Sequence, residues 1–148
     1  GDVFAESSFA KQIAMIEARL IPPIIRHGNL ESLRTVADVR DAVRAYHMLL
    51  TVNPVAGEVY NIGGQHTANV GDIMRDIVKL SPHMLRIFFE ADAERFRPLD
   101  ADLQAPDCSK FMDHTGWRPE IPYEKTLADL LDYWRERVAR EGERFLRR

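Results

Sequence analysis

Apolar residues at helical spacing, together with start and stop signals, predict five helices along the chain. The segments concerned are residues 8–20, 38–50, 69–80, 109–115 and about 124–147. Ser7 or Ser8, Asp38 and Asn69 precede the first three helices, and each can accept a hydrogen bond from a free amide of the first turn. Asp41 stands where the partner residue of a capping box would lie.

Short β-prone runs between the helices predict strands, and these runs read "PIIRHGN", "SLRTV", "EVYNI" and "MLRIFFE". Residues 91–109 show no periodicity and are predicted to form a long loop. Because helices and short strands alternate, the pattern indicates the α/β or the α+β class, of which α/β is the prediction, with residues 1–148 forming one domain.

Composition excludes several classes of protein. The chain has 148 residues, of which 45% are hydrophobic and 29% charged, as in an ordinary globular domain. Its net charge of −3 gives no basic surface for nucleic acid, so no nucleic-acid partner is expected. The single cysteine, Cys108, excludes an intramolecular disulfide and fits a reducing, cytoplasmic location. The longest apolar run, residues 20–25, is broken by prolines and predicts no membrane segment.

The stretch "GEVYNIGG" could belong to a nucleotide-binding loop, because a predicted strand runs directly into two glycines. A dinucleotide fingerprint needs a third glycine opening the next helix, and the residues after Gly63 and Gly64 supply none. A turn at the end of a strand is therefore the favoured interpretation. The five histidines have no ligand spacing, so no metal site is expected. No residue stands in a nucleophile motif, and Cys108 is expected to be a small, half-buried side chain.

Two loops carry candidate anion-binding residues. In "AERFRPLDAD", Arg95 or Arg97 could grip a diphosphate, while Asp100 could accept a hydrogen bond from a ribose hydroxyl. In "GNLESLR", Asn29 offers an amide and Arg34 could point at an anion. The alternative for both loops is a solvated surface with local ion pairs of little energetic value.

Six segments in a fixed order resemble those of a known family. They are "FAKQIAMIE", "IIRHGNLESLRTVADVRDAVRAY", "GEVYNIGG", "RFRPLDAD", "DCSK" and "TGWRPEIPYEKTLADLLDYWR". They resemble the C-terminal half of extended short-chain dehydrogenases that act on nucleotide sugars, in the branch of GDP-mannose 4,6-dehydratase and GDP-4-keto-6-deoxymannose reductase. The resemblance covers about residues 3–138 and implies an α/β fold whose NAD(P)-binding Rossmann core is largely missing.

The resemblance also implies the residues that contact the nucleotide sugar, which are Val3, Phe4, Lys11, Asn29, Arg34, Arg97 and Asp100. In the implied site, Arg34 and Arg97 hold the diphosphate and Asp100 holds a ribose hydroxyl. The chain departs from the family pattern at Thr35 and Val36, where an aspartate and an aromatic residue are usual, and at Pro106, where glycine is common.

The expected function follows from this resemblance. The chain would bind a nucleotide sugar, most simply a GDP-linked one, and would not be catalytic alone, because no Tyr has a Lys four residues later. NAD(P) would serve the full-length enzyme and no cofactor would bind this chain alone.

Either an N-terminal half is supplied separately, or the chain is a free-standing interaction or scaffold protein. In the latter case, apolar surface on the first helix and on "EVYNI" would drive dimerisation. A small enzyme of unrelated chemistry is a third alternative.

Overall fold

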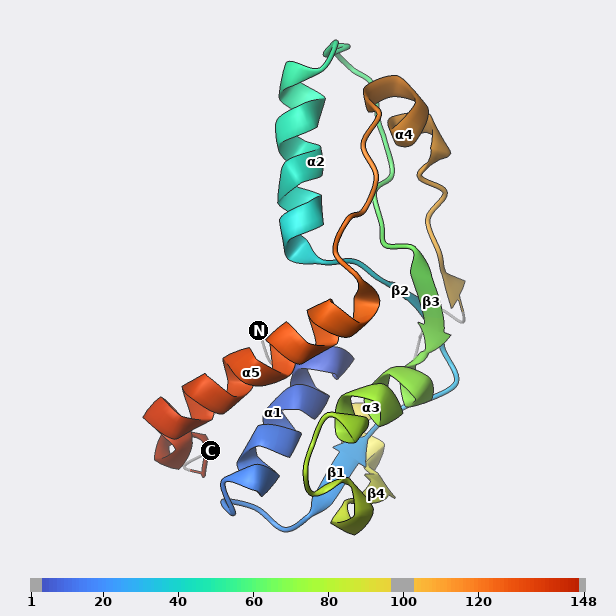
Figure 1. Ribbon diagram of the computed structural model, residues 1–148. Helices are drawn as coiled ribbons and strands as arrows, with labels where there is room; N and C mark the ends of the chain where they lie inside the picture. Colours follow the sequence, from blue (N-terminus) through green and yellow to red (C-terminus); the bar gives the residue numbers. More distant parts are fainter. Residues whose placement is uncertain (1–3, 97–102, 147–148) are drawn as a thin grey trace. The chain divides into compact units, whose positions relative to one another are not determined.

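The computed structural model describes residues 4–96 and 103–146. These residues form two compact units. Unit 1 comprises Gly1–Ser32, Asn69–Ala101 and Leu127–Arg148, and unit 2 comprises Leu33–Ala68 and Asp102–Thr126. The α/β class predicted from the sequence is confirmed, because helices alternate with short strands (Figure 1).

Unit 1 combines helices with a two-stranded parallel sheet (Figure 1). Its elements are α1 (Ala5–Glu17), β1 (Ile24–His27), α3 (Val70–Lys79), β4 (Phe88–Ala91), α5 (Tyr123–Glu141) from Leu127 onward, and the 3-10 turns η1 (Met84–Arg86), η2 (Ala93–Arg95) and η3 (Gly142–Leu146). Strand β1 pairs with β4 so that Ile25 lies opposite Phe89. Helix α1 packs against both β1 and α3.

The core of unit 1 is built from the apolar faces that the periodicity predicts. Fully buried side chains include Ile13, Ile25, Ile73, Ile77 and Leu131. Two polar contacts join α5 to α1: the Nε1 of Trp134 donates to Ser7 Oγ at 3.0 Å, and Arg135 bonds both Glu17 carboxylate oxygens at 2.7 and 2.8 Å. The first helix therefore buries its apolar face, which corrects the expectation that this face is exposed.

Unit 2 combines helices with a three-stranded sheet of order β3-β2-β5. Its elements are β2 (Leu33–Val36), α2 (Val39–Thr51), β3 (His66–Asn69), β5 (Leu103–Gln104) and α4 (Ser109–Thr115). Strands β2 and β5 are parallel. Ala45, Phe111 and Trp117 form a buried cluster, and the partly buried residues around it are Met48, Leu49, Tyr60, Ile62 and Met112. We call this group the unit 2 core.

Most helix predictions are confirmed, with corrections at the ends. Asp38 and Asn69 cap α2 and α3 as predicted, by accepting from the amides of Arg40 and Asp72. Helix α1 begins earlier than predicted, after Phe4, whose side chain makes no capping bond, so the serine cap is wrong. Helix α5 ends at Glu141 rather than near residue 147, where a 3-10 turn replaces the last predicted turn.

The strand predictions were less accurate. The segment "EVYNI" is not a strand, because within the described part of the chain it has no ladder partner. Residues 66–69 form β3, which was not predicted, and the expected loop at 91–109 contains η2 and β5. The first residues of "MLRIFFE" form a 3-10 turn, and only its end is a strand. No helix in the described ranges is long and apolar enough to cross a bilayer.

Candidate functional site

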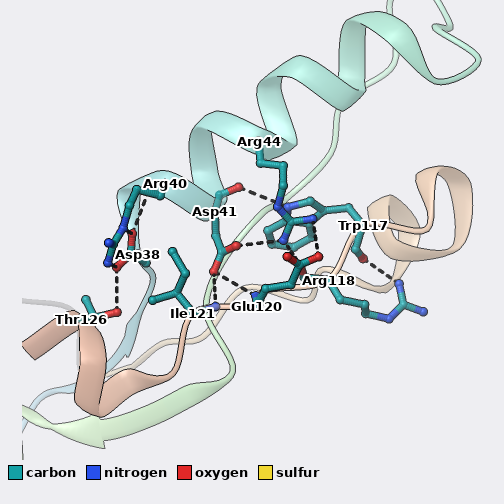
Figure 2. Close-up of polar contacts among 9 residues, drawn as sticks. All are labelled: Asp38, Arg40, Asp41, Arg44, Trp117, Arg118, Glu120, Ile121 and Thr126. Carbon is teal, nitrogen blue, oxygen red and sulfur yellow. Dashed lines mark hydrogen bonds and ion pairs between the residues drawn. The ribbon is translucent and has the colours of Figure 1, made fainter.

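A network of polar contacts surrounds the start of α2 in unit 2 (Figure 2). Asp38 is buried, and its carboxylate accepts from the Arg40 amide at 2.9 Å and from the Arg40 guanidinium at 2.8 Å through both Nε and Nη2. The hydroxyl of Thr126 donates to the same carboxylate at 2.9 Å. Asp38 therefore does more than cap α2, because it also binds Thr126 in the first turn of α5.

Asp41 is the second buried carboxylate of this network. Its Oδ2 accepts from the backbone amides of Glu120 and Ile121, both at 3.0 Å, and its Oδ1 accepts from Arg44 at 2.8 Å (Figure 2). The carbonyl of Asp41 accepts from Trp117 Nε1 at 3.2 Å. Asp41 thus ties the segment after α4 to α2, instead of acting as the partner in a capping box.

Both carboxylates are held in the ionised form. The hydrogen bonds from Arg40 hold the pKa of Asp38 well below its ordinary value, and burial opposes them only in part. Burial acts to raise the pKa of Asp41, but the hydrogen bonds from Arg44, Ile121 and Glu120 outweigh it, so that this pKa is also lowered. Each oxygen of the two carboxylates already accepts at least one hydrogen bond from these partners, which favours a structural role for the pair.

A cavity of about 460 Å³ lies beside this network, within unit 2. It is lined by Val36, Ala37, Asp38, Asp41, Ala42, Tyr46, Ile62, Gly63, Gly64, Gln65, His66, Trp117, Pro119, Ile121, Pro122, Tyr123, Glu124 and Thr126. The ring of His66 stacks on that of Tyr123, with centroids 3.8 Å apart. Gly64 has no room for a side chain, because a Cβ would lie 1.6 Å from the carbonyl oxygen of Val36.

The cavity is unsuited to a diphosphate. Its described lining contains three carboxylates, those of Asp38, Asp41 and Glu124, and neither Lys nor Arg. Phosphate groups are held by arginines, lysines or helix amides that point at them. Gly64 therefore permits close packing of the chain, whereas the predicted turn at the end of a strand is not observed, because "EVYNI" is not a strand and Gly63 and Gly64 lie in an irregular segment.

In unit 1, Arg95, at the end of η2, contacts two segments that are distant in the sequence. Its Nη1 donates to Ser8 Oγ of α1 at 3.0 Å, and its Nε donates to Asp92 at 3.2 Å. The backbone of Arg95 also passes so close to Gly28 that a Cβ there would lie 2.3 Å from the Arg95 carbonyl oxygen. Arg95 thereby holds η2 close to α1 and to Gly28, the residue after β1.

Three of the predicted nucleotide-contacting residues lie in the described part of unit 1. Phe4 is exposed just before α1, and Lys11 lies two turns further on, with its Nζ 4.5 Å from the ring centroid of Phe145 and 5.7 Å from that of Trp134. Asn29 builds its own turn, accepting from the Glu31 amide at 2.9 Å and donating to Ser32 at 2.8 Å.

The remaining predicted residues are distributed differently. Arg34 lies on β2 of unit 2, where its Nη1 donates to the carbonyl of Leu33 at 2.8 Å. Val3, Arg97 and Asp100 lie outside the described residues. The described side chains thus place Phe4, Lys11 and Asn29 in one unit and Arg34 in the other.

Sequence reasoning missed the most connected residues. Asp41, Arg44 and Trp117 form the centre of the network, yet the sequence singled out only Asp41, as a capping residue. Their contacts reach about eighty positions along the chain, so no local pattern could have identified them. Cys108 is buried rather than half-buried as expected, and burial together with the Asp107 charge raises the pKa of its thiol. In the described ranges no cluster of metal-ligating side chains occurs.

Comparison with known proteins gives the family. The model for GDP-mannose 4,6 dehydratase matches residues 1–130, which is most of the chain. The chain belongs to the GDP-mannose 4,6-dehydratase family. This confirms the resemblance inferred from the six sequence segments.

Individual relatives agree with this family. The chain is 30% identical to GDP-6-deoxy-D-mannose reductase of Pseudomonas aeruginosa over 143 residues, which are 95% of this chain and 45% of the relative. It is 28% identical to dTDP-glucose 4,6-dehydratase of Haemophilus influenzae over 120 residues, covering 76% of this chain and 35% of that protein. The chain therefore spans less than half the length of these relatives.

Solved structures show the same partial coverage. The structure of RMD from Pseudomonas aeruginosa complexed with NADPH matches with a TM-score of 0.81 and 26% identity, over 93% of this chain and 44% of that one. UDP-glucose 4-epimerase from Thermotoga maritima with UDP-glucose matches with a TM-score of 0.73 and 21% identity, over 93% and 41% of the two chains. The fold is thus that of one part of the enzymes in this family.

Proposed function

We propose that this chain is the nucleotide-sugar-binding part of an NAD(P)-dependent nucleotide-sugar dehydratase, reductase or epimerase, with a GDP-linked hexose as ligand. The observation that carries the proposal is the family match together with 30% identity to GDP-6-deoxy-D-mannose reductase over 95% of the chain. A GDP ligand is favoured over a UDP or dTDP ligand because both of these matches are to enzymes named for GDP sugars. We also propose that the protein is located in the cytoplasm.

In unit 1, the ligand would contact Phe4, Lys11 and Asn29. Arg95 bridges Ser8 of α1 and Asp92, and its carbonyl lies beside Gly28, the residue before Asn29. Arg97 would then bind the diphosphate, because a guanidinium bonds phosphate oxygens in pairs. Arg34 would supply a second positive charge, and Asp100 would accept from a ribose hydroxyl.

We also propose that the chain does not catalyse the reaction alone. It has no Tyr with a Lys four residues later and no glycine-rich dinucleotide loop, so it would bind no NAD(P) by itself. Turnover of a GDP-hexose by this chain with added NAD(P)H would refute this part of the proposal.

Thermal unfolding with added ligands tests the binding. A ligand present at about 100 times its dissociation constant stabilises the folded state by about 2.7 kcal/mol, which gives a measurable shift in Tm. GDP and GDP-mannose should raise the Tm, whereas UDP-glucose and NAD should not. No shift with any of these ligands would contradict nucleotide-sugar binding, and an equal shift with UDP-glucose would contradict the preference for GDP.

Variants locate the site. Arg34→Ala and Arg97→Ala should each reduce the shift produced by GDP-mannose. Arg75→Ala is the matched control, because Arg75 is an exposed arginine on α3 whose main partner is the neighbouring Asp72. If Arg75→Ala reduces the shift as much as the other two variants, the effect is one of overall charge and the assigned residues are wrong.

A second candidate is an interaction or scaffold protein that acts as a dimer. It is favoured by the exposed apolar side chains of α2, such as Val39 at 72% and Leu50 at 75% of their full area. Sedimentation across micromolar concentrations distinguishes this candidate, because a chain that remains a monomer cannot act as a dimeric scaffold.

A further inference from the structure

The ammonium group of Lys11 lies against two aromatic rings at the C-terminal end of unit 1. Its Nζ is 4.5 Å from the ring centroid of Phe145 and 5.7 Å from that of Trp134, and the two ring centroids are 6.0 Å apart in an edge-to-face arrangement. At these distances a cation is attracted by the face of a ring. Trp134 is buried and Phe145 is half-buried, so the ammonium is partly removed from water.

Two neighbouring rows of side chains on α1 face different parts of unit 1. Ser7 and Lys11 are four residues apart and form one row, which faces α5, because Ser7 Oγ accepts from Trp134 Nε1 at 3.0 Å. Ser8 and Gln12 form the next row. Ser8 accepts from η2 at 3.0 Å, and the Gln12 side chain bonds the amide and the carbonyl of one β1 residue at 2.8 and 3.1 Å. The ammonium of Lys11 therefore lies on the α5 side of α1.

Asn29, another residue assigned to the nucleotide, lies on the other side of α1. It follows Gly28, where a Cβ would lie 2.3 Å from the carbonyl oxygen of Arg95, so Asn29 stands beside η2 and the end of β1. For Lys11 to bind a phosphate of the same nucleotide, its ammonium has to leave the two rings and swing across α1. The flexible four-carbon stem of lysine permits this movement.

The 3-10 turn η3 carries the ring of Phe145 to Lys11. The turn begins at Gly142, directly after α5, where a Cβ would lie 2.8 Å from Cδ1 of Leu20. It therefore starts in close contact with the segment that follows α1. From there it doubles back and sets Phe145 beside Trp134. The position of the Phe145 ring is thus determined by packing at both ends of the turn.

Arg137 of α5 is a second cation beside the same two rings. Its guanidinium carbon lies 5.1 Å from the centroid of Trp134 and 5.6 Å from that of Phe145. Arg137 is also held by other groups, since it donates to the Tyr133 hydroxyl at 3.2 Å and lies 3.7 Å from the Glu141 carboxylate. Like charges repel, so the rings hold two cations less tightly than they would hold one. The contact with the lysine is therefore readily reversible.

We propose that Phe145 is a positioning residue that holds the ammonium of Lys11 on the α5 side of α1 until a phosphate group draws it away. The inference rests on the proposed function, because it takes Lys11 as a contact of the nucleotide sugar. A charge-assisted bond to phosphate is stronger than a cation–π contact at a partly exposed site, so the nucleotide displaces the ring. Phe145 thereby lowers the affinity for the nucleotide, and η3 regulates the site.

Nuclear magnetic resonance of the chain with 13C-labelled lysine reports the position of the ammonium. Methylene protons above the face of an aromatic ring resonate at higher field than the same protons in water. The ε-methylene signals of Lys11 and Lys110 should both be shifted, since Lys110 Nζ lies 4.8 Å from the ring centroid of Tyr60. Lys79, which pairs with a carboxylate, is the unshifted reference. Phe145→Leu should move the Lys11 signal toward the reference and leave the Lys110 signal unchanged.

Titration with GDP follows the release of Lys11. In the parent chain GDP should move the Lys11 signal in the same direction as Phe145→Leu does, while Lys110 keeps its shift. Phe145→Leu should bind GDP about 3-fold more tightly in calorimetry, because no cation–π contact with this residue has to be broken. Leucine keeps an apolar side chain in the turn, so its packing is retained. Phe145→Tyr keeps the ring and is the matched control, with the shift and the affinity of the parent.

Three results overturn the proposal while the proposed function stands. They are GDP binding that leaves the Lys11 signal at its shifted position, a free chain whose Lys11 signal has no shift, and a Phe145→Leu variant that binds GDP no more tightly than the parent. If neither the parent nor Phe145→Leu binds GDP, the proposed function fails and the regulation fails with it. The Lys110 signal separates both cases from a general loss of structure, which would not be confined to Lys11.

Discussion

Asp41 offers the sharpest test of how unit 2 is held together. Its Oδ2 is the acceptor for the amides of Glu120 and Ile121, and its Oδ1 accepts from Arg44. In Asp41→Ala both amides lose their acceptor. A hydrogen bond to a charged group contributes about 1.5–3 kcal/mol, so the two amide bonds together contribute about 3–6 kcal/mol. Because Glu120 is exposed and water can replace part of the loss, we expect destabilisation of about 3 kcal/mol.

Hydrogen exchange measures this effect at the two amides. A loss of about 3 kcal/mol corresponds to roughly 100-fold faster exchange of Glu120 and Ile121, since 1.36 kcal/mol is a factor of ten. Asp41→Asn keeps one acceptor oxygen and should cost about 1–2 kcal/mol. The exposed Asp113 provides the control, as Asp113→Ala should change stability by less than about 0.5 kcal/mol. Unchanged exchange of the two amides in Asp41→Ala would refute the assignment of Asp41 as their acceptor.

Three further predictions concern the whole chain. Gly28→Ala should lower the urea midpoint by an amount equivalent to about 1–3 kcal/mol, because its Cβ would meet the carbonyl of Arg95 at 2.3 Å; an unchanged midpoint would show that this close approach is not required. The pKa of Asp38 is lower in the folded chain than in the unfolded chain, so the unfolded chain binds more protons in acid. The stability that Asp38 contributes at neutral pH should therefore be lost as the pH falls below about 4. The urea midpoint measured as a function of pH checks this, and a midpoint that rises on acidification would contradict it. Trp117 and Trp134 lie one in each unit, so single-tryptophan variants should give coincident transitions if the chain unfolds as the single domain that the sequence predicts.

Local signals in the sequence were sufficient for the helices. The caps at Asp38 and Asn69 depend on bonds within a few residues, and the structure has both. The predicted start of α1 was wrong, because Phe4 precedes the helix and its side chain makes no capping hydrogen bond. The general preference for serine at the position before a helix could not indicate this.

Strands could not be predicted equally well, because a strand exists only where a partner pairs with it. "EVYNI" has the composition of a strand but no ladder among the described residues, whereas residues 66–69 have a weak composition and pair with β2. The same reason explains the candidate site. The contacts of Asp41 with Glu120 and Ile121, and of Arg95 with Ser8 and Gly28, join residues roughly seventy to ninety positions apart.

The sequence by itself determined the family, the α/β class and the helices, because ordered motifs and helical periodicity are properties of neighbouring residues. Tertiary structure alone decided which charges are buried and which apolar faces stay exposed. Asp41 became a structural acceptor because the segment after Trp117 folds back over α2. Helix α1 buried its apolar face while α2 kept a second one in solvent, since packing within a unit covers only those side chains that its own elements can reach.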